Sequence, residues 1–318
     1  QQDVTGDFTV PAGKTVTLDL NGKTVTNSEG DTFTVALGGS LTITGNGTVD
    51  NKTHQKADIY NNGTVVLNGG SYTRSAEVGT STSESGGNSF YNILNHGTMT
   101  ISEGVSVTSS GHFSSLIDNG YYNYGSSNAR TGYVNGTNAE TPSLTISGGT
   151  FSGGINTIKN DDGATLTITD GTFSNVTQAV VQNNNTANIS GGTFNAGAYH
   201  AVESKYYSGV HNAGTTSISG GTFTGALYKA GDNASFTISG GTFNYDPSAY
   251  LASGYMATES NGTWTVTKVE GVAAIGSTGY STLTEAINAV SDNTETTIVL
   301  QQDVTGDFTV PAGKTVTL

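Results

Sequence analysis

A short motif repeats through the middle of this chain and limits the folds that the chain can adopt. It consists of an alternating stretch, a glycine pair and a Thr-Phe ending, as in LTISGGTF at 144–151. Successive clear copies end at phenylalanines 20 to 29 residues apart: Phe151, Phe173, Phe194, Phe223 and Phe243. Weaker copies precede them and end at Val25, Val49, Tyr72 and Val107. A period near 20 residues is typical of solenoids, whereas β-propeller blades repeat every ~40–50 residues.

Each copy predicts short strands separated by tight bends. In the run 144–147, Leu, Thr, Ile and Ser alternate apolar and polar, which is the pattern of a strand with one buried face. The pair Gly148–Gly149 predicts a bend where side chains would collide. Further on, an apolar residue is followed by Asn or Asp, which predicts a second corner because these residues tolerate left-handed backbone. We therefore predict an all-β chain, a right-handed parallel β-helix (β-solenoid) of about ten rungs stacked ~4.8 Å apart.

A second repeat is much longer. Residues 1–18 and 301–318 have the same sequence, QQDVTGDFTVPAGKTVTL. This identity predicts a parent protein that repeats every 300 residues, with neighbouring copies of the same module in tandem. We assign residues 1–269 to the β-helix body of one module, with its first rung at 1–18 and a C-terminal cap at 246–269. Residues 270–318 are then the start of the next module, with a capping helix at 282–291 and another first rung.

The two ends of a solenoid need covers, because open strand edges pair with other chains. The one strong helical pattern supplies the first cover: Thr282 and Glu285 form a capping box. Four apolar residues of this segment fall on one helical face: Leu283, Ala286, Ile287 and Val290. At the other end, Asp246-Pro247 predicts a short helical turn. The single tryptophan, Trp264, is expected to cover the last rung.

Charge and composition exclude several classes of partner. The formal net charge is −14 at pH 7, which repels the phosphate backbone of nucleic acids. The chain has no cysteine, so disulfides, thiolate catalysis and cysteine-based zinc sites are excluded. No apolar run approaches the ~18 residues of a membrane span. We therefore expect no nucleic-acid partner and no membrane insertion by this segment.

Three stretches together carry a resemblance to a known family. They are the SGGTF rungs, GYSTLTEAINAV with the following TIVLQQDVTGDFTV, and the closing DPSAYLASGYMATESNGTWTV. Over nearly its whole length the chain resembles the right-handed parallel β-helix, or pectin-lyase-like, repeat modules of large surface proteins of Gram-positive bacteria. The resemblance implies an extracellular, cell-surface-attached protein. It does not imply one activity, because that superfamily includes lyases, hydrolases, adhesins and passive stalks.

Enzymes of that superfamily use grouped aspartates, often with calcium, and an Arg or Lys base on an exposed face. Here the two arginines, Arg74 and Arg130, fall in predicted insertions. The run Asn160-Asp161-Asp162 resembles paired catalytic aspartates, but it lies at the Asn corner, where turn chemistry alone predicts such residues. The histidines show no metal-ligand spacing. We predict no catalytic residue, no metal and no cofactor.

Two insertions at the Asn corner, 119–142 and 203–211, suggest a binding site instead. Their tyrosines are Tyr121, Tyr122, Tyr124, Tyr206 and Tyr207. The uninterrupted corners between them carry Asn160, Asp161, Asp162, Asn183 and Asn184. Aromatic faces stack on sugar rings, and amides and carboxylates bond sugar hydroxyls. These residues are the predicted ligand-binding site, for host or bacterial glycans; the alternative is that the tyrosines only pack their own loops.

The function predicted from these features is that of a non-enzymatic extracellular surface repeat module. It would be a rigid stalk or adhesin segment of a tandem-repeat protein, because stalk units are repeated verbatim and catalytic domains seldom are. One alternative is a polysaccharide lyase or glycoside hydrolase of the pectin-lyase-like class. A second alternative is a module whose ends associate into filaments.

Overall fold

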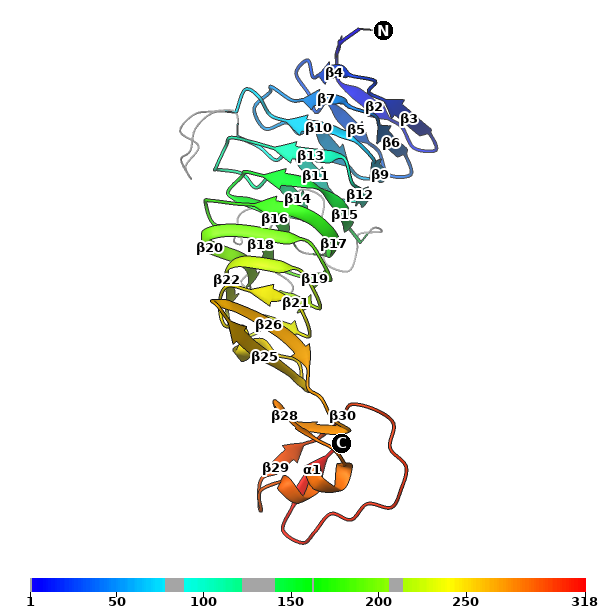
Figure 1. The fold of residues 1–318 in the computed structure, drawn as a ribbon. Coiled ribbons are helices and arrows are strands. Elements are labelled where there is room, and N and C mark those ends of the chain that lie inside the picture. The colour runs from blue at the N-terminus through cyan, green and yellow to red at the C-terminus, as the bar shows by residue number, and fades with distance from the viewer. Residues whose placement is uncertain (1, 78–88, 122–140, 162, 206–213) are drawn as a thin grey trace. The chain divides into compact units, whose positions relative to one another are not determined.

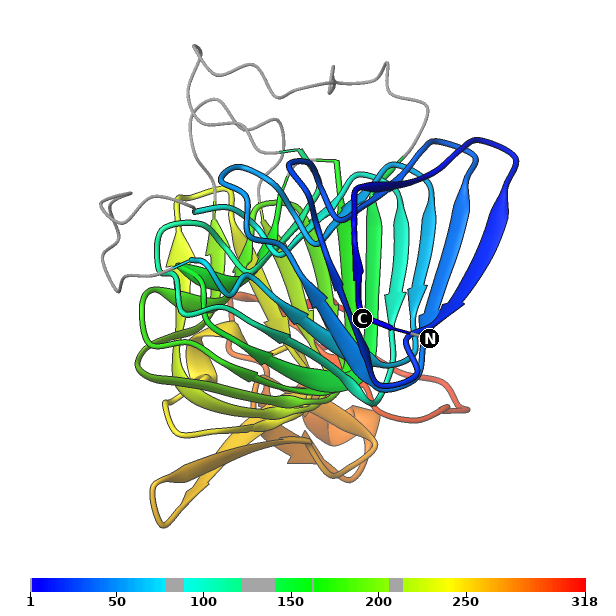
Figure 2. The same ribbon diagram turned by 90° about the horizontal axis from the view of Figure 1, so that it is seen from above.

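The computed structural model describes residues 2–77, 89–121, 141–161, 163–205 and 214–318. Contacts divide the chain into two compact units, Gln1–Phe236 and Thr237–Leu318. The first unit is a right-handed solenoid of parallel strands wound into three walls (Figures 1 and 2). The predicted all-β parallel β-helix with a short helix is therefore confirmed. The contact boundary falls at residue 236/237, whereas the sequence had suggested a module boundary at 269/270.

The three walls of the first unit follow the parts of the motif. Wall A carries the LTI segments: β3 (Thr15–Asp19), β6 (Ser40–Thr44), β9 (Thr64–Leu67), β12 (Thr98–Ile101), β19 (Thr186–Ile189), β21 (Thr215–Ile218) and the first halves of β15 (Ser143–Ser152) and β17 (Thr165–Ser174). Wall B carries the Thr-Phe segments: β1 (Val4–Thr5), β4 (Lys23–Thr26), β7 (Gly47–Asp50), β10 (Gly70–Thr73), β13 (Val105–Thr108), the second halves of β15 and β17, and the starts of β20 (Thr193–Lys205) and β22 (Thr222–Ala230). Wall C carries the Asn corner: β2 (Phe8–Val10), β5 (Phe33–Val35), β8 (Ile59–Asn61), β11 (Ile93–Asn95), β14 (Ile117–Asn119), β16 (Asn156–Asn160), β18 (Ala179–Asn183) and the ends of β20 and β22. β23 (Ser235–Ile238) crosses the boundary between the units.

Identical residue types stack in register inside the solenoid. Ile146 pairs with Ile168, and Phe151 pairs with Phe173 one wall further on. The rings of Phe151, Phe173, Phe194 and Phe223 stack nearly parallel, with centroids 4.7 to 4.9 Å apart. These four side chains are at most 1% exposed. The core is therefore a set of continuous apolar ladders, as the repeat predicts.

A ladder of asparagines runs beside the apolar ones on wall C. Each side-chain amide donates to the side chain one rung on, over 2.7 to 2.9 Å, through Asn61, Asn95, Asn119, Asn160, Asn183 and finally Thr216. The same amides also donate to the first carbonyls of wall A; Asn160, for example, bonds Thr186 O at 2.9 Å. The corner asparagines thus close each turn from inside, and the ladder continues across the 41 residues between Asn119 and Asn160.

The glycine pairs at the bend between walls A and B allow successive rungs to approach closely. A Cβ on Gly148 would lie 2.8 Å from the Cα of Glu103 on the preceding turn. Gly149 has a φ of +100°, and a Cβ there would lie 2.8 Å from Val105 O. No real Cβ tolerates such contacts, and L-residues disfavour that backbone. The close approach of successive rungs therefore explains why two glycines occupy this bend.

Most strand pairs of the second unit are antiparallel. β24 (Thr242–Phe243) pairs antiparallel with β26 (Thr263–Lys268), which places Trp264 opposite Phe243. β25 (Tyr255–Ser260) forms a hairpin with β26 through Asn261-Gly262, both at positive φ. This is the turn geometry that two-residue hairpins favour. The predicted helical turn is a 3-10 helix, η1 (Ser248–Tyr250), and Asp246 Oδ1 accepts from Ser248 N at 2.9 Å.

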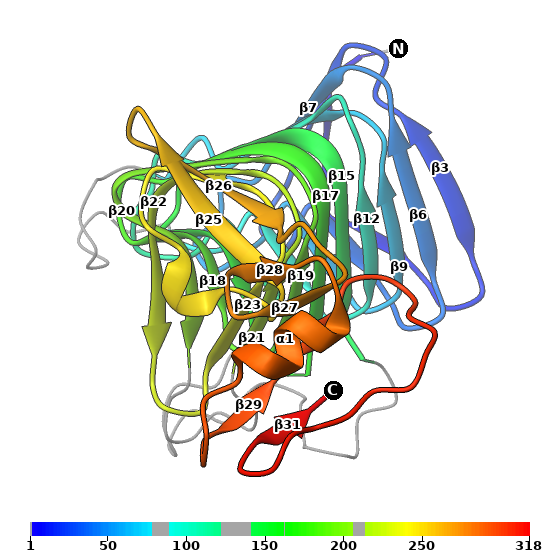
Figure 3. The same cartoon turned by 60° about the horizontal axis from the view of Figure 1, so that its bottom comes forward.

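The helix predicted at 282–291 is confirmed as α1 (Leu283–Ala289). The Thr282 hydroxyl accepts a hydrogen bond from Glu285 N at 3.1 Å, and the Glu285 carboxylate accepts one from the Ser281 hydroxyl at 2.7 Å. Figure 3 shows α1 beside β27 (Ala273–Ile275) and β28 (Thr278–Tyr280), which form a small sheet with β30 (Val299–Leu300). The helix buries Leu283, Ala286 and Ile287, and Val290 follows in the same apolar cluster.

The repeated 18-residue sequence adopts two different structures. In residues 1–18 it forms β1, β2 and most of β3, each paired with the next rung. In residues 301–318 only β31 (Thr315–Thr317) is a strand, and it pairs in parallel with β29 (Glu295–Thr297). The expectation of a complete first rung at 301–318 is therefore wrong for this chain.

The asparagine ladder yields a stability prediction. We expect Asn160→Ser to lower the free energy of unfolding by about 1–3 kcal/mol, because Asn119 and Asn183 would each lose a buried hydrogen-bond partner. The matched control is Asn188→Ser on the exposed face of β19, expected to change stability by less than ~0.5 kcal/mol. Urea unfolding followed by circular dichroism compares them. Equal effects of the two substitutions would contradict the role of the ladder.

Candidate functional site

One outward-facing column on wall C is charged. The register of β14, β16, β18, β20 and β22 places Asp118, Lys159, Gln182, Glu203 and Tyr228 at equivalent positions on successive rungs. Two positions further along their strands or just past them lie Asp161, Asn184 and Lys205. His200 precedes Glu203 on β20. We call Asp118, Lys159, Asp161, Gln182, His200, Glu203 and Lys205 the charged face.

These side chains point away from the apolar core and are nevertheless buried. Asp118 is 0% exposed, Glu203 2% and Lys159 8%. Equivalent positions on earlier rungs, Tyr60 and Leu94, are half-buried. Burying a charge is costly unless it is paired. Charged groups enclosed on a few successive rungs, in a chain with only 11% charged residues, therefore mark this face as the best candidate for a site.

Ion pairs link members of the charged face within single rungs, and a hydrogen bond joins two neighbouring rungs. Lys159 Nζ lies 2.6 Å from Asp161 Oδ2, and Asn184 donates to the other oxygen of Asp161 at 3.2 Å. Glu203 contacts both His200 Nδ1 and Lys205 Nζ, each at 2.5 Å. Each lysine is therefore paired with a carboxylate. Cationic and anionic groups therefore lie side by side along the strands of this wall.

Aromatic rings flank the charged face at both ends. His200 stacks on Tyr228 with centroids 4.6 Å apart, and Tyr228 is 46% exposed. At the other end His96 stacks on Tyr121 at 4.4 Å. Tyr121 is 7% exposed, so its ring packs against wall C and has little open surface. The accessible aromatic platform is thus the His200–Tyr228 stack. Neither of these two residues is among the predicted site residues.

The predicted site residues divide into three groups. Asp161 belongs to the charged face, Asn184 donates to it, and Tyr121 follows Asp118 on the first rung of that face. Asn160 and Asn183 are 0% exposed members of the internal ladder. The expectation that those two amides face a ligand is therefore wrong. In the sequence, a corner asparagine whose side chain points into the core looks the same as one whose side chain points to the outer surface. The remaining predicted residues lie outside the described part of the chain: Tyr122, Tyr124, Asp162, Tyr206 and Tyr207.

A different signal would have found the charged face. When the turns are aligned on their corner asparagines, the residue directly before each asparagine lies between two inward-facing side chains. That residue is Asp118, Lys159 and Gln182 in three successive turns, and Glu203 where serine replaces asparagine. In strand geometry this position points outward.

Arg74 belongs to a second buried cluster, near the N-terminal end of the solenoid. It is 1% exposed, and its guanidinium donates to Glu77 Oε2 at 3.0 Å and to Thr53 O at 3.0 Å. Burial raises the pKa of Asp58 well above its usual range, although Arg74 and a backbone donor from Asn51 lower it. Arg74 therefore ties the loop after β7 to β10, and its contacts are those of a structural residue.

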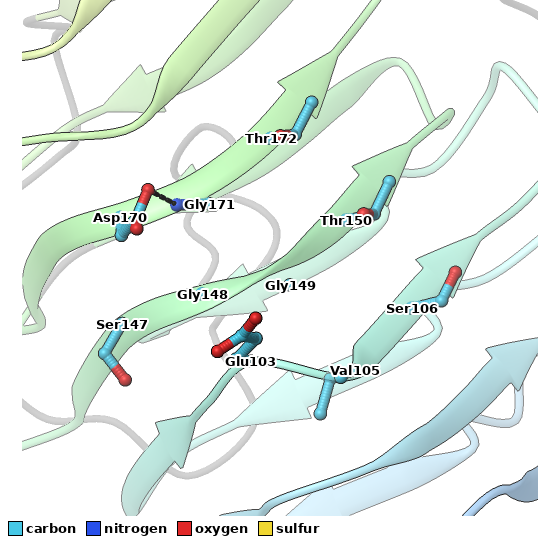
Figure 4. Close-up of a pocket in the computed structure, with 11 residues that line it drawn as sticks. Glu103, Val105, Ser106, Ser147, Gly148, Gly149, Thr150, Asp170, Gly171 and Thr172 are labelled. Carbon is cyan, nitrogen blue, oxygen red and sulfur yellow. Dashed lines mark hydrogen bonds between the residues drawn. The ribbon is translucent and has the colours of Figure 1, made fainter.

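A shallow groove of about 460 Å³ lies over the glycine bend, lined by three successive turns (Figure 4). Figure 4 shows Glu103 and Asp170 on different turns around Gly148–Gly149. Asp170 Oδ1 accepts from Gly171 N at 2.7 Å. The groove exists because the glycines have no side chains. Close packing of successive rungs already explains why glycines occupy these positions. We therefore place the candidate site on the charged face.

Within the described residues, no three His, Asp or Glu side chains lie close enough to share a metal ion. The helices of the described ranges are too short and too polar to cross a bilayer. Comparisons of the chain with protein-family models, curated proteins and solved structures found no match.

Proposed function

We propose that this chain is a rigid, non-enzymatic repeat module of an extracellular surface protein. Its resemblance to pectin-lyase-like surface modules of Gram-positive bacteria supports the extracellular location, and the identity of residues 1–18 with 301–318 supports the role of a tandem stalk unit. The observation that carries the proposal is the continuity of the internal ladders. Register is kept from Asn61 to Asn95 and from Asn119 to Asn160, although insertions lengthen both of these turns. A dry, close-packed core of this kind resists bending. A segment that holds other parts of a protein at a distance from the cell needs that stiffness.

A second function, glycan binding, is favoured by the charged face. Sugars are bound by aromatic platforms next to paired donors and acceptors. Tyr228 offers an exposed ring, and the buried ion pair of Glu203 and Lys205 lies on the rung next to it on the same wall. We propose that polysaccharides of host or bacterial origin lie along this face, parallel to the solenoid axis.

A binding screen tests this proposal. We expect the chain to be retained on a glycan array and Tyr228→Ala to weaken retention at least ~tenfold, which corresponds to the ~1.4 kcal/mol expected of a stacked ring. Phe113→Ala is the matched control, because Phe113 is also partly exposed, at 39%, and lies outside the charged face. Equal retention of both variants would remove the charged face from the proposal.

The same preparations distinguish the module from an enzyme. Each retained polysaccharide is incubated with the chain and assayed for new reducing ends and for unsaturated products. We expect neither. Turnover that is lost in Glu203→Gln would establish the lyase or hydrolase alternative and contradict the non-enzymatic proposal.

A further inference from the structure

Hydroxyl groups cover much of the outer surface of wall A. Along its strands, buried Leu or Ile residues alternate with polar residues that reach the surface, as Thr145 and Thr167 do beside Ile146 and Ile168. Figure 3 shows β6, β9, β12, β15 and β17 of this wall side by side. Their parallel register aligns the outward residues into columns that run along the solenoid.

Two of these columns are rich in hydroxyls and free of charge. The first column, read from β9 to β21, has a hydroxyl at every position: Thr64, Thr98, Ser143, Thr165, Thr186 and Thr215. The second column, two residues further along the same strands, is Val66, Thr100, Thr145, Thr167, Asn188 and Ser217. We call these two columns the hydroxyl face.

The hydroxyls of this face are not used by the protein itself. Within the described part of the chain, none of them donates to a backbone or side-chain oxygen. By contrast, the hydroxyls of Ser147, Thr169 and Ser190, two residues further along, each donate to a carbonyl of the preceding rung. On wall B, Ser174 donates to Ser152 at 3.0 Å. The hydroxyl face therefore presents donors and acceptors to whatever lies outside the molecule.

The spacing of the hydroxyl face is fixed in two directions. Neighbouring rungs lie ~4.8 Å apart, and alternate residues of one strand lie ~6.6 Å apart. Threonine is branched at Cβ, which restricts χ1 and with it the position of the hydroxyl. The close-packed core beneath, with phenylalanine centroids 4.7 to 4.9 Å apart, prevents the rungs from sliding. The hydroxyls therefore form a rigid lattice.

A solid with a similar repeat fits this lattice better than a dissolved partner does. In tetrahedrally bonded water, oxygens linked by bonds of ~2.8 Å have second neighbours ~4.5 Å apart, which is close to the rung spacing. One hydroxyl gains little by binding one water molecule, because it binds liquid water as well. Many bonds formed to one solid add up, since each contact holds the others in place. The face offers a dissolved partner neither an aromatic ring nor a charge to bind.

We propose that the hydroxyl face binds ice. The outermost waters of the crystal bond the hydroxyls of successive rungs, and the threonine methyl groups fill the space between them. This surface lies on a different wall from the charged face. The inference therefore goes beyond the proposed function and does not depend on glycan binding.

Uptake of the chain into slowly grown ice, together with thermal hysteresis, tests the inference. We expect the unchanged chain to be enriched in the ice and to hold the freezing point below the melting point. Thr167→Tyr should lower the uptake at least ~tenfold, because its ring stands above the hydroxyls and holds a solid away from them. The matched control is Thr172→Tyr, which places the same ring on the same strand but on wall B. Tyrosine is favoured in strands, so both variants should fold.

Thr98→Lys gives a second readout at an exposed position, where no buried contact is disturbed. Its charged side chain should reduce uptake as Thr167→Tyr does. Circular dichroism compares the fold of each variant with that of the unchanged chain.

Uptake of the unchanged chain and of Thr172→Tyr, with a loss in Thr98→Lys or Thr167→Tyr at unchanged fold, supports the inference. Exclusion of the unchanged chain from ice overturns it. Equal losses in Thr167→Tyr and Thr172→Tyr also overturn it, and so does full uptake of both wall A variants. None of these outcomes affects the glycan retention by which the charged face is judged.

Discussion

Replacing Phe173 with alanine will lower the free energy of unfolding of the solenoid by about 3–5 kcal/mol. Phe173 is fully buried, and its ring stacks on Phe151 at 4.8 Å and on Phe194 at 4.9 Å. Alanine would leave a cavity between two rings that the rungs hold at a fixed separation, so the site cannot collapse around it. The loss should therefore lie near the upper end of that range.

The measurement is urea unfolding followed by circular dichroism. The matched control is Val176→Ala, because Val176 is 68% exposed and lies three residues along the chain. It should change stability by less than ~0.5 kcal/mol. A loss below ~1 kcal/mol for Phe173→Ala would mean that the phenylalanine stack does not support the core.

Replacing Arg74 with methionine will have an effect of similar size, about 3–5 kcal/mol at neutral pH. Methionine keeps much of the side-chain volume and removes the charge. Glu77 would then lose its buried partner, and the carbonyls of Thr53 and Lys56 would lose their donor. Lys52→Met is the control, because the Lys52 side chain, which pairs with Asp50, is 55% exposed.

The loss at Arg74 should depend on pH. Burial raises the pKa of Asp58 and of Glu77, and Arg74 opposes both shifts. An acid whose pKa is higher in the folded than in the unfolded chain binds its proton more tightly when folded, so its stabilising effect is present at low pH and is lost as pH rises through the folded pKa. Without Arg74 both pKa values rise further. We therefore expect the Arg74→Met penalty to shrink as pH falls from 7 toward ~4, and a constant penalty would contradict this explanation.

The parts of the fold that follow from local pattern could be predicted from sequence. Leu144, Ile146 and Phe151 alternate with polar residues and are buried as expected. Thr282 and Glu285 form the predicted cap of α1. Each of these features depends on residues close together in the chain, whose geometry is fixed by the strand or helix period.

What depends on neighbouring rungs could not be predicted in the same way. Asn160 looks like a turn residue, and only the stacked Asn119 and Asn183 show that its amide points inward. Val4 and Phe8 lie in strands that pair with the next rung, whereas the identical sequence at 304–308 forms no strand, so strand formation here is not decided by local sequence alone. The charged face arises only when Lys159 and Glu203 are brought onto one wall by register.

The most direct test of the whole account is a pair of distances along wall A. Spin labels at Thr42 and Thr167 are four rungs apart in the observed register, and labels at Thr42 and Ser217 are six rungs apart. At ~4.8 Å per rung, electron–electron dipolar spectroscopy should give about 19 Å and about 29 Å, whatever the lengths of the insertions between them. Distances that fail to grow by ~10 Å between the two pairs would contradict a stacked solenoid.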